Sequence, residues 1–93
     1  MKTGTTASGT YYLYNKKDRD VPIVFVHGVG LTHEIWRPQL EFFNYHSTLA
    51  YDILGHGKSS LENKEISFYD FSDQLIGLMD HLNIKKIHLV GFS

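Results

Sequence analysis

One continuous apolar run constrains the fold more than any other stretch of this sequence. Residues 21–26 read Val-Pro-Ile-Val-Phe-Val, a β-branched and aromatic run without polar alternation. Such a run predicts a strand buried on both faces, as in a parallel sheet covered by helices. Pro22 is tolerated near the start of the strand, where its missing N–H need not enter the ladder. The run therefore indicates an α/β fold.

Two further strand patterns flank this run. Residues 2–6 and 10–15 predict a β-hairpin, because Thr, Tyr and Leu favour strands and Ser8-Gly9 supplies a turn. Residues 47–51 predict another short strand, and a polar, glycine-containing stretch follows them.

Two helices are expected between the strands. After a loop over residues 31–34, a short helix is expected to begin near Trp36 or Pro38, since proline is acceptable in a first helical turn. A longer amphipathic helix is predicted from apolar residues at steps of three and four, which are Phe68, Phe71, Leu75, Leu78 and Leu82. Asn83 is suited to end that helix in a left-handed conformation.

A last buried strand is predicted over residues 87–90, which are mostly apolar and are followed at once by Gly91. The predicted fold class is α/β: a β-hairpin followed by a βαβαβ, mostly parallel sheet. We expect residues 1–93 to form an incomplete domain, the N-terminal part of a larger sheet. In such a part the last strand would be an unpaired apolar edge, so we expect the 93 residues to fold poorly alone.

The composition argues against several classes of partner. A formal net charge of −1 argues against nucleic acid or an anionic membrane as a partner. The chain has no cysteine, which offers no thiolate metal site and fits a reducing compartment. No signal-peptide pattern is visible and no apolar run approaches the roughly 20 residues of a membrane span. We therefore expect a soluble, cytoplasmic protein.

Two glycine loops match nucleotide-binding motifs only in part. Gly28-Val29-Gly30 begins like the dinucleotide fingerprint G-x-G-x-x-G, and Asp52 lies about where a ribose-binding acid would sit, but His33 replaces the third glycine. Gly57-Lys58-Ser59 ends like a P-loop whose first glycine would have to be residue 52. An aspartate there would repel phosphate, so the P-loop interpretation fails. A dinucleotide-binding oxidoreductase stays open as the less favoured alternative.

The loop His27-Gly28-Val29-Gly30 is better interpreted as an oxyanion loop. Acyl transfer builds negative charge on the substrate oxygen, and hydrogen-bond donors must be oriented toward it in advance. A strand that ends in His-Gly can turn sharply and leave the N–H of Val29 pointing into the space above the sheet. The strand that ends in Gly91-Phe92-Ser93 is expected to lie beside it, so that donor and serine meet at the carboxyl ends of neighbouring strands.

Gly91-Phe92-Ser93 matches the first half of a nucleophile elbow, Gly-x-Ser-x-Gly. In that turn the serine hydroxyl stands above the sheet, and a side chain at Gly91 is expected to collide with the chain that leaves the turn. Alone, a three-residue pattern is weak support, so the assignment depends on the other segments.

Four segments follow one another in a specific order: residues 24–30, Trp36, residues 51–59 and residues 89–93. Together they resemble the N-terminal part of the α/β-hydrolase fold superfamily, in particular its serine esterases, lactonases and carbon–carbon bond hydrolases. The resemblance implies that Ser93 is the nucleophile, that Val29 supplies one oxyanion N–H, and that an ester, lactone or related carbonyl substrate reacts through an acyl-enzyme. It implies a structural role around the site for His27, Gly28, Gly30, Gly55, His56, Gly57 and Gly91.

The resemblance also implies that the triad acid and histidine, the second oxyanion donor and the lid follow Ser93. The 93 residues alone are therefore expected to be catalytically inert. No other histidine is expected to act as the base: His33 and His46 lie in loops with no predicted acid nearby, His81 lies near a helix end and His88 lies in a strand. No histidine pair has metal-ligand spacing, so neither a metal nor a cofactor is predicted. A non-catalytic binding protein with the same fold is a second alternative, and the substrate and oligomeric state are left open.

Overall fold

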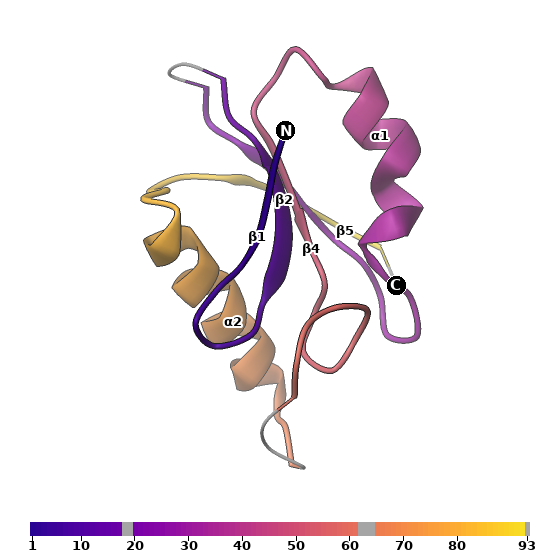
Figure 1. The fold of residues 1–93 in the computed structure, drawn as a ribbon, viewed down its shortest axis with the longest axis vertical. Coiled ribbons are helices and arrows are strands. Elements are labelled where there is room, and N and C mark those ends of the chain that lie inside the picture. Colours follow the sequence, from indigo (N-terminus) through magenta and orange to yellow (C-terminus); the bar gives the residue numbers. More distant parts are fainter. Residues whose placement is uncertain (18–19, 62–64, 93) are drawn as a thin grey trace.

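A helix covers each face of a five-stranded sheet in the computed structural model, which describes residues 1–17, 20–61 and 65–92 (Figure 1). The elements in chain order are β1 (Lys2–Thr5), β2 (Tyr11–Asn15), β3 (Ile23–Val26), the 3₁₀ helix η1 (His33–Trp36), α1 (Arg37–Phe42), β4 (Thr48–Tyr51), α2 (Phe68–His81) and β5 (His88–Gly91). The predicted α/β class and the predicted order of elements are confirmed.

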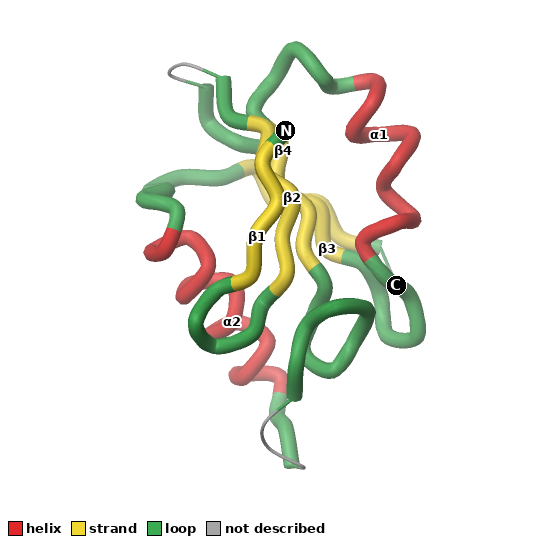
Figure 2. Tube along the Cα trace, viewed as in Figure 1, coloured by secondary structure: helices red, strands yellow, loops and turns green. Residues whose placement is uncertain are grey.

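The sheet has the order β1-β2-β4-β3-β5 (Figure 2). The hairpin β1–β2 joins the sheet antiparallel to β4, whereas β4, β3 and β5 run parallel to one another. Val26 at the end of β3 pairs with Tyr51 of β4 on one side and with Gly91 of β5 on the other. The three parallel strands therefore end at the same level, and the loops that follow them meet at one edge of the sheet.

Each face of the sheet has its own hydrophobic core. On the α2 side the buried residues include Val24, Leu49 and Leu78, and on the α1 side they include Phe25 and Trp36. Consecutive residues of β3 thus point to opposite cores, because side chains alternate across a strand. The prediction that this strand is buried on both faces is confirmed.

Two details of the helices differ from the sequence expectations. The first helical turn begins at His33, inside the expected loop, because the hydroxyl of Thr32 accepts a hydrogen bond from the N–H of Glu34 at 3.3 Å. Phe68, expected on the buried face of α2, is 90% exposed. It is the first residue of the helix, and helical side chains lean toward the N-terminus, so Phe68 projects past the sheet. The left-handed conformation expected at Asn83 is confirmed by its φ of 58°.

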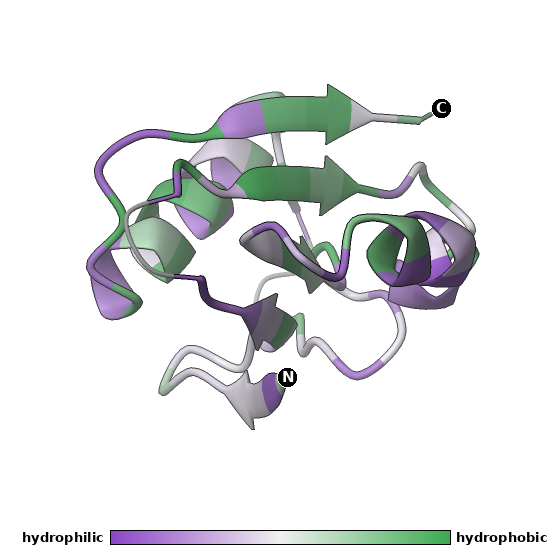
Figure 3. Cartoon of the chain, turned by 90° about the horizontal axis from the view of Figure 1, so that it is seen from above, coloured by the Kyte–Doolittle hydropathy of each residue, from purple (hydrophilic) through white to green (hydrophobic). Residues whose placement is uncertain are grey.

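The expectation that the last strand is buried is wrong for this chain. β5 pairs only with β3, and all of its residues are exposed, Leu89 at 59% and Val90 at 38%. Figure 3 shows β5 as the outermost strand, an apolar arrow above β3. Its outer edge has no neighbour among the described residues, which agrees with the apolar edge predicted for these 93 residues. Within the described ranges, no helix has the length and apolarity needed to cross a membrane.

Candidate active site

The carboxyl ends of the three parallel strands surround an open pocket of about 460 Å³. It is lined by the loop after β3, by the ends of β4 and β5 and by the start of α2. In Figure 1 the end of β5 lies beside the loop that follows β3. The residues that line the pocket are Val26, His27, Gly28, Val29, Tyr51, Ile53, Phe68, Phe71, Gly91 and Phe92.

His27 fixes the start of the loop after β3. Its ring is buried, and Nδ1 lies 2.8 Å from the carbonyl oxygen of Gly28, while Nε2 lies 3.1 Å from the backbone nitrogen of Ile53. Because the N–H of Ile53 can only donate, Nε2 accepts, and the ring proton sits on Nδ1 and is donated to Gly28. The structural role expected for His27 thus has a physical basis: one imidazole bridges the ends of β3 and β4.

His56 fixes the other end of the same loop. Its Nε2 accepts a hydrogen bond from the N–H of Gly30 at 2.9 Å, and its Nδ1 donates to the carbonyl oxygen of Leu54 at 2.9 Å. Gly30 has a φ of 88° and Gly55 a φ of 73°, conformations that side-chain-bearing residues rarely adopt. Both ring nitrogens of His56 are thus hydrogen-bonded to backbone groups, the N–H of Gly30 and the carbonyl of Leu54.

Val29 stands between these two anchored points. Its side chain is 81% exposed at the pocket. Within the described part of the chain, no protein acceptor takes its backbone N–H, whereas the N–H groups of Gly30 and Leu31 are both used. A free N–H in a fixed loop at the mouth of a pocket is what stabilisation of a developing oxyanion needs.

Asp52 organises the turn after β4 and is fully buried. Its Oδ1 accepts from the backbone N–H of His33 at 2.7 Å and from the imidazole Nδ1 of His33 at 2.9 Å, and its Oδ2 accepts from the N–H of Lys58 at 2.9 Å. Burial alone raises the pKa of Asp52, but the hydrogen bonds from Lys58 and His33 outweigh it, so the pKa lies below its ordinary value. The carboxylate is therefore ionised. Because it is buried and already accepts three hydrogen bonds, it is not free to bind the hydroxyls of a ribose.

The expectation that no acid lies near His33 is wrong. Asp52 is 19 residues away in sequence, but it lies at the end of β4 directly beside the start of η1. The contact could not be read from the sequence, because it depends on which strands are neighbours. His33 therefore has an acidic partner, but both belong to the support of the loops and neither lines the pocket.

Two polar residues that sequence reasoning missed complete this support. The Ser59 hydroxyl donates to the carbonyl oxygen of Asp52 at 2.6 Å and accepts from the N–H of Tyr11 at 2.9 Å. The Gln74 amide donates to that carbonyl at 3.1 Å and accepts from the N–H of Leu54 at 3.0 Å. A signal for Gln74 existed, since it lies three residues after Phe71 and four before Leu78 on the apolar face of α2.

The predicted glycines divide into two kinds. Gly57 has a φ of 51°, and a Cβ added there would overlap the carboxylate of Asp52, so this position requires glycine. At Gly91 no described atom lies within 4 Å of an added Cβ, so the collision predicted there does not occur with any described residue. The chain that would leave the turn follows Phe92, and Ser93 itself lies outside the described residues. Phe92 donates its N–H to the carbonyl oxygen of Val26 at 3.1 Å.

No cluster of three or more His, Asp or Glu side chains suited to a metal ion occurs in the ranges that the structure describes. Both ring nitrogens of His27, the one histidine that lines the pocket among the described residues, are instead hydrogen-bonded to backbone atoms.

Comparison with known proteins identifies the family. Residues 21–93 match the model of the alpha/beta hydrolase fold. An (E)-2-((N-methylformamido)methylene)succinate hydrolase of Acinetobacter baylyi is 35% identical over 81 residues, covering 86% of this chain and 31% of that protein. The 3-oxoadipate enol-lactonase 1 of the same organism is 33% identical over 73 residues, covering 76% of this chain and 27% of that protein. The chain thus spans about a third of the length of these relatives.

A solved structure supports the fold independently. The enol-lactonase from Burkholderia xenovorans superposes with a TM-score of 0.87 at 24% identity, over 99% of this chain and 37% of that one. At that identity the likeness concerns the fold alone. The predicted resemblance is confirmed: the chain belongs to the α/β-hydrolase fold family.

Proposed function

We propose that the protein containing this chain is a serine hydrolase, in which Ser93 is the nucleophile and the N–H of Val29 is one oxyanion donor. The observation that carries the proposal is the N–H of Val29, which has no acceptor among the described residues and lies between the points anchored by His27 and His56 at the pocket. Phe92, bonded to the end of β3, brings the chain to this loop, and Ser93 is the next residue in the sequence.

In the proposed reaction, the Ser93 oxygen forms a bond to the carbonyl carbon of an ester or lactone. The carbonyl electron pair moves onto the oxygen, where Val29 donates a hydrogen bond, and the serine proton passes to a histidine base that follows Ser93 in the whole protein. Collapse of the intermediate breaks the bond to the alcohol oxygen, which takes the proton from the histidine; the alcohol then leaves, or in a lactone stays tethered to the acyl group. The acyl-enzyme that remains is hydrolysed by water, which restores the serine hydroxyl. The 93-residue chain, with no described residue available as that base, is proposed to be inert alone.

The names of the relatives support a carbonyl substrate without fixing it. One is an enol-lactonase and the other a hydrolase of a succinate derivative. An ester, lactone or similar small carbonyl compound is the proposed substrate class.

The alternative of a dinucleotide-dependent oxidoreductase finds no support in the site. It requires a carboxylate that is free to bind ribose hydroxyls. The carboxylate of Asp52 is fully buried and accepts three hydrogen bonds from His33 and Lys58.

The test is covalent labelling of the full-length protein with a fluorophosphonate, followed by peptide mass spectrometry. Labelling at Ser93 is expected, and it should vanish in Ser93→Ala but persist in Ser72→Ala, a change at an exposed serine of α2. A folded full-length protein that takes no label would overturn the proposal and favour the non-catalytic binding protein.

A further inference from the structure

The imidazole of His33 helps to fix the orientation of the Asp52 carboxylate. Its Nδ1 lies 2.9 Å from Oδ1 of Asp52, and the backbone N–H of His33 donates to the same oxygen at 2.7 Å. Because the pKa of Asp52 lies below its ordinary value, the carboxylate is ionised and can only accept hydrogen bonds. Nδ1 of His33 therefore carries a proton and donates it to Asp52.

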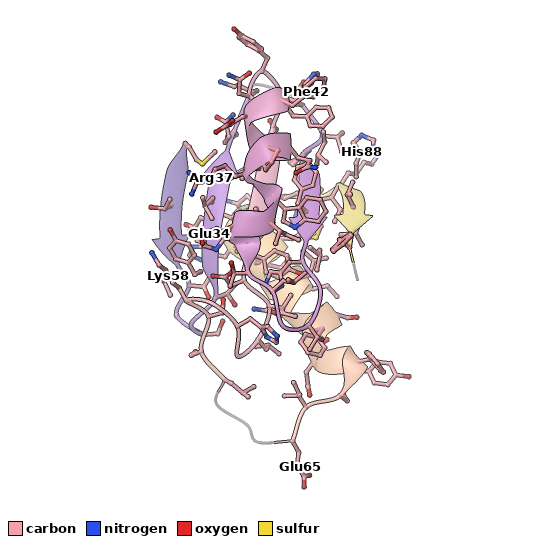
Figure 4. The ribbon with its side chains drawn as sticks, turned by 90° about the vertical axis from the view of Figure 1, so that its right-hand side faces the viewer. Glu34, Arg37, Phe42, Lys58, Glu65 and His88 are labelled. Atoms are coloured by element: carbon pink, nitrogen blue, oxygen red, sulfur yellow. The ribbon has the colours of Figure 1, made fainter. Side chains whose placement is uncertain are left out.

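The ring of His33 is packed as well as hydrogen-bonded. Its side chain is 14% exposed, and the ring of Tyr11 on β2 lies 5.3 Å away between ring centres. The ammonium of Lys58 in turn lies 4.8 Å from the centre of the Tyr11 ring. Figure 4 shows Glu34, the residue after His33, and Lys58 on the same side of the molecule, away from His88 of β5. The start of η1 and the turn after β4 thus meet beside β2.

The second oxygen of the Asp52 carboxylate holds the turn that carries His56. Oδ2 accepts a hydrogen bond from the N–H of Lys58 at 2.9 Å, and the N–H of Ser59 donates to the carbonyl oxygen of His56 at 2.9 Å. A Cβ added at Gly57 would overlap the carboxylate, so the turn is packed directly against it. Because a carboxylate is planar, a rotation that moves Oδ1 also moves Oδ2 and disturbs this turn.

These contacts lead to the N–H of Val29. The His56 ring accepts from the N–H of Gly30, the residue after Val29. His33 is also the residue at which the loop after β3 passes into η1. His33 therefore supports this loop at its end and, through Asp52 and His56, beside Val29.

From this arrangement we infer that His33 is a positioning residue: its Nδ1–H, bonded to Asp52, keeps the N–H of Val29 oriented toward the developing oxyanion. The inference rests on the proposed serine hydrolase and adds a residue on which its site depends. The orientation of a donor matters most in the transition state, where the substrate oxygen carries charge, and much less for the bound substrate. Loss of the bond should therefore lower kcat and leave KM nearly unchanged.

Three substitutions at His33 in the full-length protein separate the Nδ1–H from the bulk of the ring. The amide nitrogen of asparagine is as many bonds from Cβ as Nδ1 of histidine, whereas that of glutamine is one bond further. With para-nitrophenyl acetate, His33→Leu is expected to lower kcat about tenfold with KM within about twofold of wild type. His33→Asn should restore kcat to within about threefold of wild type, and His33→Gln should not.

The two amide variants decide the question even if His33→Leu does not fold. Both carry a polar amide, and they differ in whether its nitrogen can occupy the place of Nδ1. Equal kcat values in His33→Asn and His33→Gln, or a folded His33→Leu protein with the kcat of wild type, would overturn the inference.

Hydrogen exchange distinguishes failure of this inference from failure of the proposed chemistry. The N–H groups of Gly30 and Leu31 are hydrogen-bonded, so their exchange reports how firmly the loop is held. Exchange in a peptide over residues 28–32 is expected to be at least about fivefold faster in His33→Gln than in His33→Asn, with no difference in a peptide of α2. This pattern in a protein that takes no fluorophosphonate would remove the serine hydrolase and keep the positioning role. Ester hydrolysis with equal exchange and equal kcat in the two variants would remove the positioning role.

Discussion

The backbone N–H of Gly30 donates a hydrogen bond of 2.9 Å to Nε2 of His56, and this bond joins two loops that are 26 residues apart in sequence. The opposite nitrogen of the same ring is bonded to the carbonyl oxygen of Leu54, so the ring cannot turn without breaking both contacts. A histidine that takes no part in the proposed chemistry thereby controls where the neighbouring N–H of Val29 points.

Removal of this ring should reduce turnover more than binding. In full-length His56→Ala, the loop that is proposed to hold the oxyanion donor loses one of its two anchors, and the N–H of Val29 is no longer oriented in advance. We expect kcat for an ester to fall by about 10- to 100-fold with a small change in KM. His46→Ala, at an exposed histidine, should stay within about twofold of wild type. A folded His56→Ala protein with unchanged kcat would show that the loop is held without the ring.

Asp52 should make stability depend on acid pH. Its pKa in the folded protein lies below the ordinary value of 3.8, because hydrogen bonds from Lys58 and His33 outweigh the effect of burial. A depressed pKa stabilises the folded state fully above the unfolded value, and that contribution is lost as the pH falls through the folded value. We therefore expect the free energy of unfolding of wild type to fall between about pH 5 and about pH 2.

Urea unfolding of full-length wild type and Asp52→Asn over this pH range checks the assignment. The asparagine amide faces at least one N–H donor, so the variant should be less stable by about 2–4 kcal/mol near neutral pH. This difference should shrink in acid, because the variant has no carboxylate to protonate. Asp73→Asn, at an exposed helix position, should keep the pH dependence of wild type. A constant difference across the pH range would contradict the role given to Asp52.

Much of the fold could be predicted because its signals are local. The apolar run of β3, the three-and-four spacing of α2 and the left-handed Asn83 each depend on a few neighbouring residues. The adjacency of β3 and β5 also followed, because serine and oxyanion loop must meet in the resembled family. These predictions are confirmed by the strand pairing and the element bounds.

The failures involve contacts that no local pattern encodes. His33 contacts Asp52 only because β4 lies beside β3. Asp52 follows directly after β4, and its carboxylate therefore reaches His33 at the start of η1. The apolar periodicity predicted that Phe68 is buried, and this is wrong. Periodicity shows which face of a helix is apolar, but it does not show how far along the helix the sheet extends to cover that face. β5 has the composition of a central strand, and only its position in the sheet decides whether it is covered.

Two adjacent serines should differ sharply in their effect on stability. Ser59 is buried and bridges the carbonyl oxygen of Asp52 to the N–H of Tyr11, whereas Ser60 is exposed and makes one long side-chain bond of 3.4 Å to the carbonyl oxygen of Ser8. Ser59→Ala leaves the partly buried N–H of Tyr11 without its acceptor and removes a buried hydrogen bond to the carbonyl oxygen of Asp52, so it should cost about 1–3 kcal/mol. Ser60→Ala should stay within about 0.5 kcal/mol of wild type. Chemical denaturation of the two full-length variants measures both, and similar values would contradict the bridging role of Ser59.

Two glycines make a matched pair with opposite expected signs. Gly57 has a φ of 51°, and its added Cβ would overlap the carboxylate of Asp52. Gly57→Ala must therefore displace a group that holds three hydrogen bonds and must also adopt a strained backbone, so we expect a loss of at least about 2 kcal/mol.

Gly77 lies in the middle of α2, it is exposed, and no described atom lies within 4 Å of an added Cβ. Gly77→Ala should stabilise the full-length protein by about 0.5–1 kcal/mol, since alanine restricts the unfolded chain and favours the helix. Thermal and urea unfolding of both variants measure the contrast. If Gly57→Ala were tolerated as well as Gly77→Ala, the turn after β4 would have room for a Cβ beside Asp52. That result would contradict the close packing of this turn, from which we infer that His56 and the loop after β3 are held in place.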